Sequence, residues 1–156
     1  MAHLHDKIDF TTEVFIVFQG KVLLRKHDKY KIWLSVGGHI ELDEDPIQAA
    51  LREVKEEVGL DVQLFGQPIS VSNEGENGYH ELLPPMFMNR HHISDTHDHI
   101  TLTYFAKATT STIRNQEDEH SDELRWFTAE ELSDSKFGIR DSVQKYALAA
   151  LQTIQG

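Results

Sequence analysis

The sequence predicts a single α/β domain built around a mixed β-sheet. Two observations favour this fold class: short runs rich in Val, Ile and Phe recur along the 156 residues, and two longer stretches have the spacing of amphipathic helices. No stretch has the composition of an interdomain linker, and no period of about 20 to 50 residues repeats. We therefore expect residues 1–156 to form one domain, with residues 1–10 as a mobile N-terminal segment.

The expected strands lie on both sides of the first helix. They are the runs at 12–18, 22–24, 32–36, 62–65, 69–71, 86–88, 100–108 and 124–127. The first two form a hairpin, and the third ends at Gly37-Gly38. A short helix is expected to begin at 128–131, and an amphipathic helix over 139–154 follows it.

The first helix has a start and a stop signal. Asp45 is a suitable N-cap, Pro46 suits the first helical position, and Gln48 completes a capping box. Gly59 is expected to end the helix in a left-handed conformation. The spacing of five apolar residues predicts one stripe that faces the core: Ile47, Ala50, Leu51, Val54 and Val58.

Three glutamates of this helix, Glu53, Glu56 and Glu57, are spaced i, i+3 and i+4 and turn away from the apolar stripe. We expect them to form one solvent-facing patch. Like charges at this spacing repel, so the patch is either an exposed acidic face diluted by Arg52 and Lys55 or a site for a divalent cation. Hard carboxylate oxygens suit Mg²⁺ or Mn²⁺.

A longer pattern surrounds these glutamates. The run from Gly38 to Leu60, GHIELDEDPIQAALREVKEEVGL, resembles the Nudix box G-x5-E-x7-R-E-U-x-E-E-x-G-U at every specified position, where U is a bulky aliphatic residue. The run from Trp126 to Leu132 looks like the W-x-x-x-E-E-L segment common near the end of such domains. The resemblance implies a Nudix-type α/β/α sandwich and a Mg²⁺- or Mn²⁺-dependent hydrolase of a nucleoside diphosphate linked to a moiety X.

The resemblance also implies roles for individual residues. Three residues look like metal-binding carboxylates, one of which acts as general base: Glu53, Glu56 and Glu57. Arg52 looks like the residue that pairs with Glu44 and orients these carboxylates, and the carbonyl of Gly38 resembles a further metal ligand. The mechanism implied is in-line attack of water on one phosphorus.

A fourth carboxylate commonly reaches such sites from a loop before the late Trp segment. Acidic residues crowd this region here: Glu117, Asp118, Glu119, Asp122 and Glu123. Among these residues, we expect Glu119 to be the metal ligand. The alternative is a solvated run of charge before a strand.

Histidines cluster shortly before the expected strand at 100–108. They are His91, His92, His97 and His99, with Asp95 and Asp98 among them. Three interpretations are open: a second site for a transition metal, contact with the substrate near the cleft, or a polar loop. The spacing matches no established metal motif. His3 and His5 are assigned to the mobile N-terminal segment.

The composition excludes several classes of function. The absence of cysteine excludes a disulfide framework, a thiolate metal site and a cysteine nucleophile. The formal net charge of −11 opposes binding to nucleic acid or to an acidic membrane. No apolar run approaches the roughly 20 residues of a membrane helix, and we expect a cytoplasmic protein.

The predicted function is a nucleoside tri- or diphosphate pyrophosphohydrolase with a small-molecule nucleotide substrate. The alternatives are a dinucleoside polyphosphate or nucleotide-sugar pyrophosphatase, a nucleotide-binding sensor without catalysis, and an acidic metal buffer. Gly75 stands where ADP-ribose pyrophosphatases tend to carry Pro, and Tyr79 lies just beyond the place where dinucleoside polyphosphate hydrolases tend to carry Tyr. Homodimers are common in the family, and the oligomeric state stays open.

Overall fold

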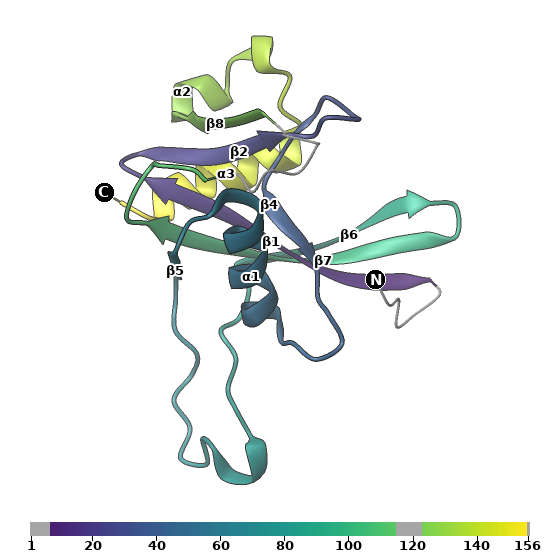
Figure 1. The fold of residues 1–156 in the computed structure, drawn as a ribbon, viewed down its shortest axis with the longest axis vertical. Coiled ribbons are helices and arrows are strands. Elements are labelled where there is room, and N and C mark those ends of the chain that lie inside the picture. The colour runs from purple at the N-terminus through teal and green to yellow at the C-terminus, as the bar shows by residue number, and fades with distance from the viewer. Residues whose placement is uncertain (1–6, 115–122, 156) are drawn as a thin grey trace.

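The computed structural model describes residues 7–114 and 123–155. Its centre is one sheet of eight strands (Figure 1): β1 (Ile8–Phe18), β2 (Lys21–Lys26), β3 (Trp33–Leu34), β4 (Val36–His39), β5 (Val62–Leu64), β6 (Phe87–Ser94), β7 (His97–Ala108) and β8 (Glu123–Phe127). The order is β3-β2-β1-β7-β5, while β4 pairs with β1, β6 with β7 and β8 with β2. The pair β1–β7 is parallel and the other pairs are antiparallel. The predicted mixed sheet is confirmed.

Two helices, α1 (Pro46–Val58) and α3 (Asp141–Thr153), cover opposite faces of this sheet. Because side chains alternate along a strand, β1 serves both layers. Val14 and Ile16 are fully buried in one cluster with residues of α1, whereas Phe15 and Val17 are fully buried in the other with residues of α3. The α/β/α sandwich is therefore confirmed, with its core split into two layers by β1. Helix α2 (Ala129–Leu132) and two 3-10 turns, η1 (Glu76–Gly78) and η2 (Ser135–Phe137), complete the elements.

The predicted ends of α1 are confirmed. The Asp45 carboxylate accepts hydrogen bonds from the backbone of Ile47 and Gln48, both at 2.8 Å, and the Gln48 side chain accepts one from the backbone N–H of Asp45 at 2.9 Å. Gly59 has φ 67°, and its N–H donates to the Lys55 carbonyl at 3.1 Å. This capping fixes where the helix begins relative to β4.

The predicted faces of α1 are partly wrong. Leu51 is 40% exposed, although it belongs to the expected apolar stripe, while Ala49 is fully buried. The side chain of Glu53 instead rests against Gly38 of β4 and pairs with Arg52, which also donates to the His39 carbonyl. The glutamates consequently do not form one solvent-facing patch.

The N-terminal strand starts earlier than expected. Residues 8–10, assigned to a mobile segment, pair in parallel with residues 98–100 of β7, so that part of the prediction was wrong. The sequence pattern did not indicate this early start, because polar residues such as Asp9 and Thr11 interrupt the apolar pattern. Both residues are nevertheless buried. Residues 1–6, with His3 and His5, lie outside the described residues.

The histidine cluster lies in a β-hairpin formed by β6 and β7, so the interpretation as a polar loop was wrong. Asp98 accepts hydrogen bonds from the side chains of Arg90 and His92 and helps to hold the hairpin. Burial and the neighbouring histidines lower the pKa of His99 to about 4. Its imidazole is therefore neutral at physiological pH.

The segment between β5 and β6 projects away from the sheet and carries η1 (Figure 1). Residues 69–71, expected as a strand, form none. The expected strand at 32–36 is divided into β3 and β4 at Ser35. Within residues 7–114 and 123–155, no helix has the length and apolar character needed to cross a membrane.

Candidate active site

The first feature of the site is the close approach of Glu53 to the end of the sheet. A side-chain carbon built on Gly38 would lie 2.3 Å from Oε1 of Glu53, which is closer than atoms can pack. The Glu53 side chain is only 14% exposed. Glycine at position 38 is therefore what allows a carboxylate from α1 to rest against the backbone of β4.

Arg52 organises the acidic groups around it. Its Nε and Nη2 donate to the two carboxylate oxygens of Glu44 at 3.0 and 2.6 Å. Its Nη1 donates to Oε1 of Glu53 at 2.9 Å and to Oε2 of Glu56 at 3.2 Å, and Nη2 also donates to the His39 carbonyl at 3.0 Å. One guanidinium thus ties the box loop (residues 40–45), the end of β4 and two helix carboxylates together, which a point charge on lysine could not do.

Glu57 is held by a different set of groups. The N–H of Gly37 donates to its Oε2 at 3.3 Å, and Nε of Arg25 lies 3.4 Å from the same oxygen. Arg25 also donates to the Ser35 carbonyl at 3.1 Å. The sequence did not indicate Arg25, because only the β-sheet register brings the end of β2 beside α1.

The three glutamates differ in exposure: 14% for Glu53, 22% for Glu57 and 57% for Glu56. Burial raises the pKa of Glu53, and the hydrogen bond and charge of Arg52 oppose this rise. The hydrogen bond from Arg52 lowers the pKa of Glu44, and Glu44 in turn raises the pKa of Arg52, which stays charged. The charge of Arg52 thus favours the ionised form of both carboxyls.

The donor set fits a hard divalent cation. The groups that would hold it are the carboxylates of Glu53, Glu56 and Glu57 and the carbonyl of Gly38, all oxygen donors. Glu53 and Glu56 share one nitrogen of Arg52, so their carboxylates converge on the same place. Glu57 faces Gly37 from the same helix. Glu119, chosen as a fourth carboxylate, lies outside the described residues.

Two cavities flank β4. One of about 230 Å³ includes Glu13, Arg25, Ser35, Gly37 and Gly38 in its walls, and it continues toward histidines of the β6–β7 hairpin. Glu13 is fixed there by hydroxyl groups of Ser35 and Thr103, each donating at 2.6 Å. The other, about 390 Å³, lies between the start of β1 and the box loop. Both cavities have box residues in their walls: Gly38 and His39 in the smaller one, and His39, Glu41 and Glu44 in the larger one.

The aromatic marker considered for dinucleoside polyphosphates lies elsewhere. Tyr79 is exposed in the projecting segment between β5 and β6, where its hydroxyl donates to Glu81 at 2.7 Å. Gly75, from the other substrate marker, lies in the same segment. Neither residue lines the cavities beside β4.

The comparisons with known proteins agree with this geometry. The family model described as the NUDIX domain matches residues 10–148. The crystal structure of a NUDIX-family hydrolase from Clostridium perfringens is 35% identical, with a TM-score of 0.81 over 92% of this chain and 96% of that chain. An Ap4A hydrolase from C. elegans shares the fold, with a TM-score of 0.65 at 15% identity over 90% of this chain and 93% of that chain.

A curated relative matches a shorter stretch. The m7GpppN-mRNA hydrolase NUDT17 of Xenopus laevis is 39% identical over 80 residues, which are 47% of this chain and 26% of that relative. This chain therefore spans about a quarter of the length of that relative. The family model covers most of the chain, and the box, the sandwich and the 35% identical hydrolase agree with it. The chain belongs to the Nudix hydrolase family, whose members act on phosphoanhydrides.

Proposed function

We propose that this protein is a Mg²⁺- or Mn²⁺-dependent pyrophosphohydrolase of nucleoside tri- and diphosphates. The observation that carries the proposal is the single guanidinium of Arg52, which binds Glu44 through two nitrogens and also contacts Glu53 and Glu56. This arrangement brings carboxylates to one end of the sheet, where Gly38 and Glu44 help to line two cavities. A solvated acidic helix face would need neither the glycine at 38 nor the bidentate ion pair.

The residues have distinct tasks in this proposal. Glu53, Glu56 and Glu57, with the Gly38 carbonyl, hold the cation, which when bound supplies charge neutralisation of the diphosphate and activation of water. Glu53 is well placed to accept a proton, because it is the most buried of the three and its pKa is raised. Arg52 positions the carboxylates, and Glu44 positions Arg52. Water then displaces the leaving phosphate group in line.

The substrate class is tested by a hydrolysis screen in saturating Mg²⁺. The panel contains nucleoside tri- and diphosphates, oxidised nucleotides, nucleotide sugars, dinucleoside polyphosphates and a cap dinucleotide, and products are separated by chromatography. We expect release of a nucleoside monophosphate with pyrophosphate or phosphate. Tight binding of nucleotides without turnover of any compound would instead identify a sensor.

The requirement for metal gives the first prediction. We expect no turnover in chelator and full recovery with Mg²⁺ or Mn²⁺, because the described cations beside these glutamates, Arg25 and Arg52, already pair with carboxylates. The same ions should raise the melting temperature by mass action. Turnover and melting are measured in parallel, and undiminished turnover in excess chelator would contradict the proposal.

A second prediction compares two adjacent glycines. In Gly38→Ala the new carbon meets the end of the Glu53 side chain at 2.3 Å, so the carboxylate must move, and a displacement of about 1 Å can cost about 100-fold in rate. In Gly37→Ala the new carbon meets the backbone oxygen of Thr12 at 2.1 Å, so the sheet itself must move, at about 1–3 kcal/mol of stability.

The two variants should therefore differ in the property that they lose. We expect Gly38→Ala to lose activity with little change in melting temperature, and Gly37→Ala to melt at a clearly lower temperature. Activity and thermal melts of both variants test this. An active Gly38→Ala enzyme would show that Glu53 need not rest against β4.

A further inference from the structure

Four neighbouring strands place histidines and one aspartate on the same face of the sheet. His39 of β4 is opposite Thr11 of β1, and Asp9 lies two residues before Thr11, so it points to the same side. Asp9 is opposite His99 of β7, and His99 is opposite His91 of β6. Residues far apart in the sequence are therefore brought together by register alone.

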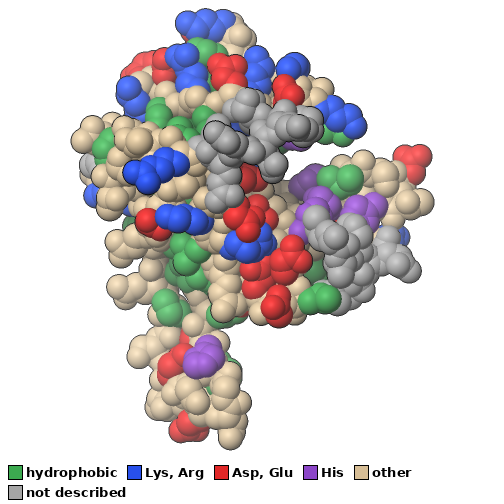
Figure 2. All heavy atoms as spheres, viewed as in Figure 1, with side chains coloured by type: hydrophobic (Ala, Val, Ile, Leu, Met, Phe, Trp, Pro, Cys, Tyr) green, Lys and Arg blue, Asp and Glu red, His purple; other side chains and the backbone are tan. Residues whose placement is uncertain are grey.

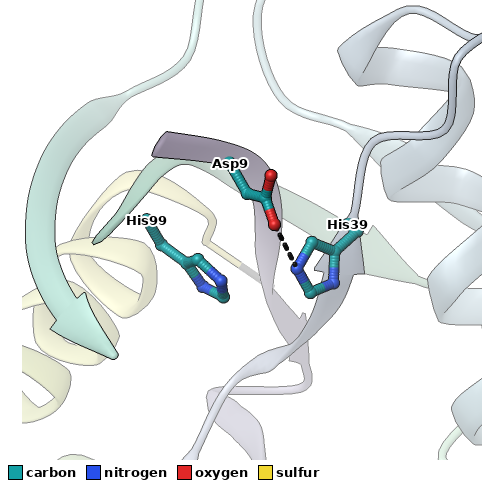
Figure 3. Close-up of side chains that lie close together, drawn as sticks. All are labelled: Asp9, His39 and His99. Carbon is teal, nitrogen blue, oxygen red and sulfur yellow. Dashed lines mark ion pairs between the residues drawn. The ribbon is translucent and has the colours of Figure 1, made fainter. Parts of the chain in front are cut away.

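The side chains converge at short range. One ligand atom from each of Asp9, His39 and His99 lies within 4.8 Å of the others, and Figure 3 shows the three side chains pointing toward one another. Nε2 of His39 lies 3.5 Å from Oδ2 of Asp9, and Nε2 of His97 lies 3.1 Å from the same oxygen. The rings of His39 and His99 are 4.8 Å apart and perpendicular, at 83°.

The chemistry of this group differs from that of the box. The glutamates of the box offer oxygen donors for a hard cation, whereas this face offers imidazole nitrogens and one carboxylate, a set that suits zinc and other first-row transition ions. Asp9 is only 6% exposed, so its carboxyl group is directed into the cluster rather than into water. His99 is neutral, the form in which imidazole binds metal. Figure 2 shows histidine side chains gathered beside the acidic side chains on one face of the molecule.

We propose that Asp9, His39 and His99 form a second metal site, for a transition ion of the zinc class, separate from the box carboxylates. Ligands of tetrahedral zinc at bond lengths of about 2.1 Å are about 3.4 Å apart. The observed ligand atoms lie within 4.8 Å of one another, so they would have to approach by up to about 1.4 Å to reach this geometry. His97, which already contacts Asp9, can serve as the fourth ligand.

The site is tested by calorimetric titration of the whole protein with Zn²⁺ in saturating Mg²⁺, which occupies the box. We expect one tight zinc site per chain. His39→Gln and His99→Gln should each weaken zinc binding by at least about tenfold. His80→Gln, which removes an exposed histidine of the projecting segment, is the matched control and should bind zinc as the parent does.

Two further variants distinguish other locations for the ion. A Glu53→Gln, Glu56→Gln double variant should keep the zinc site, because these carboxylates belong to the box. A His3→Gln, His5→Gln double variant should keep it as well. Loss of the zinc site in either double variant, or unchanged binding in both His39→Gln and His99→Gln, would overturn the proposal.

A measurement on the unmodified protein avoids dependence on the folding of any variant. Long-range ¹H–¹⁵N spectra of the histidine rings, recorded as Zn²⁺ is added in excess Mg²⁺, should show the largest shifts at ring nitrogens of His39 and His99. Shifts confined to other histidines would reject the assignment. Mg²⁺ alone should restore hydrolysis after chelation. If the proposed hydrolase function is wrong, the activity screen will show it, and the zinc titration can still succeed or fail independently.

Discussion

Replacing Glu53 or Glu56 by glutamine is expected to reduce kcat by about 100-fold or more, equivalent to about 2.7 kcal/mol on the barrier. Glutamine keeps the shape of the side chain and removes its charge, so the cation loses a carboxylate ligand while the helix remains capped and packed. Steady-state kinetics in saturating Mg²⁺ measure the effect. Glu57→Gln is expected to behave in the same way, because Glu57 faces Gly37 from the same helix.

The matched control is Glu130→Gln, which removes an exposed glutamate on α2. It should retain the activity of the parent enzyme. Thermal melts without metal should show that each box variant is folded, and Mg²⁺ should raise their melting temperatures less than it does for the parent. Parental activity in both Glu53→Gln and Glu56→Gln would refute the assignment of the site to α1.

Arg52→Ala is expected to have the next largest effect. The change removes the bidentate pair with Glu44, both contacts to helix carboxylates and the bond to the His39 carbonyl. We expect a loss of roughly 10- to 100-fold in kcat/KM, by analogy with other residues that orient metal ligands. Glu44→Ala should lose less, because Arg52 would keep its other partners. Arg52→Lys should recover only part of the lost kcat/KM, since an ammonium group cannot form the same bidentate pair with Glu44.

The double variant tests whether the two residues act through one interaction. If they do, Arg52→Ala combined with Glu44→Ala should lose less than the sum of the single losses in free energy. The measurement is kcat/KM for the four proteins of the cycle. Strict additivity would mean that Arg52 and Glu44 contribute independently despite their contact.

The pH profile provides a readout that a purely structural role would leave unchanged. In the parent, burial raises the pKa of Glu53 and Arg52 opposes this rise. Without Arg52 the opposition is lost, so the pKa rises further and ionised Glu53 is present only at higher pH. The acidic limb of kcat should therefore move to higher pH in Arg52→Ala. If the acidic limb of kcat stays at the same pH and only the plateau of kcat is lower, Arg52 does not set the ionisation of Glu53.

The local features of helix α1 could be predicted from the sequence, because they depend on the spacing of nearby residues. The capping box at Asp45, the left-handed stop at Gly59 and the i, i+3, i+4 glutamates need only residues within a few turns of one another. The box pattern added the pair of Arg52 and Glu44, which the structure shows in contact. The roles of these residues in catalysis stay predictions.

Features that depend on contacts between distant strands and helices could not be predicted from the sequence pattern. The start of β1 at Ile8 was missed because its polar side chains are stabilised by partners on β4 and β7 rather than by an apolar pattern. The expected strand at 69–71 was wrong because a short apolar run has no strand stability without a neighbouring strand to pair with. Arg25 beside Glu57 likewise depends on how β2 is placed against α1.

The family, the mixed α/β fold and the acidic helix could all be predicted from local residue spacing and from the box. Three features depend on contacts between distant residues: the exposure of the carboxylates, the burial of Glu53 against Gly38, and the convergence of histidines from β4 and β7 on Asp9. Strand register explains why the histidines meet Asp9. Hydrogen-bond pairing between strands fixes which distant residues become neighbours, and a shift of one residue would turn each side chain to the other face.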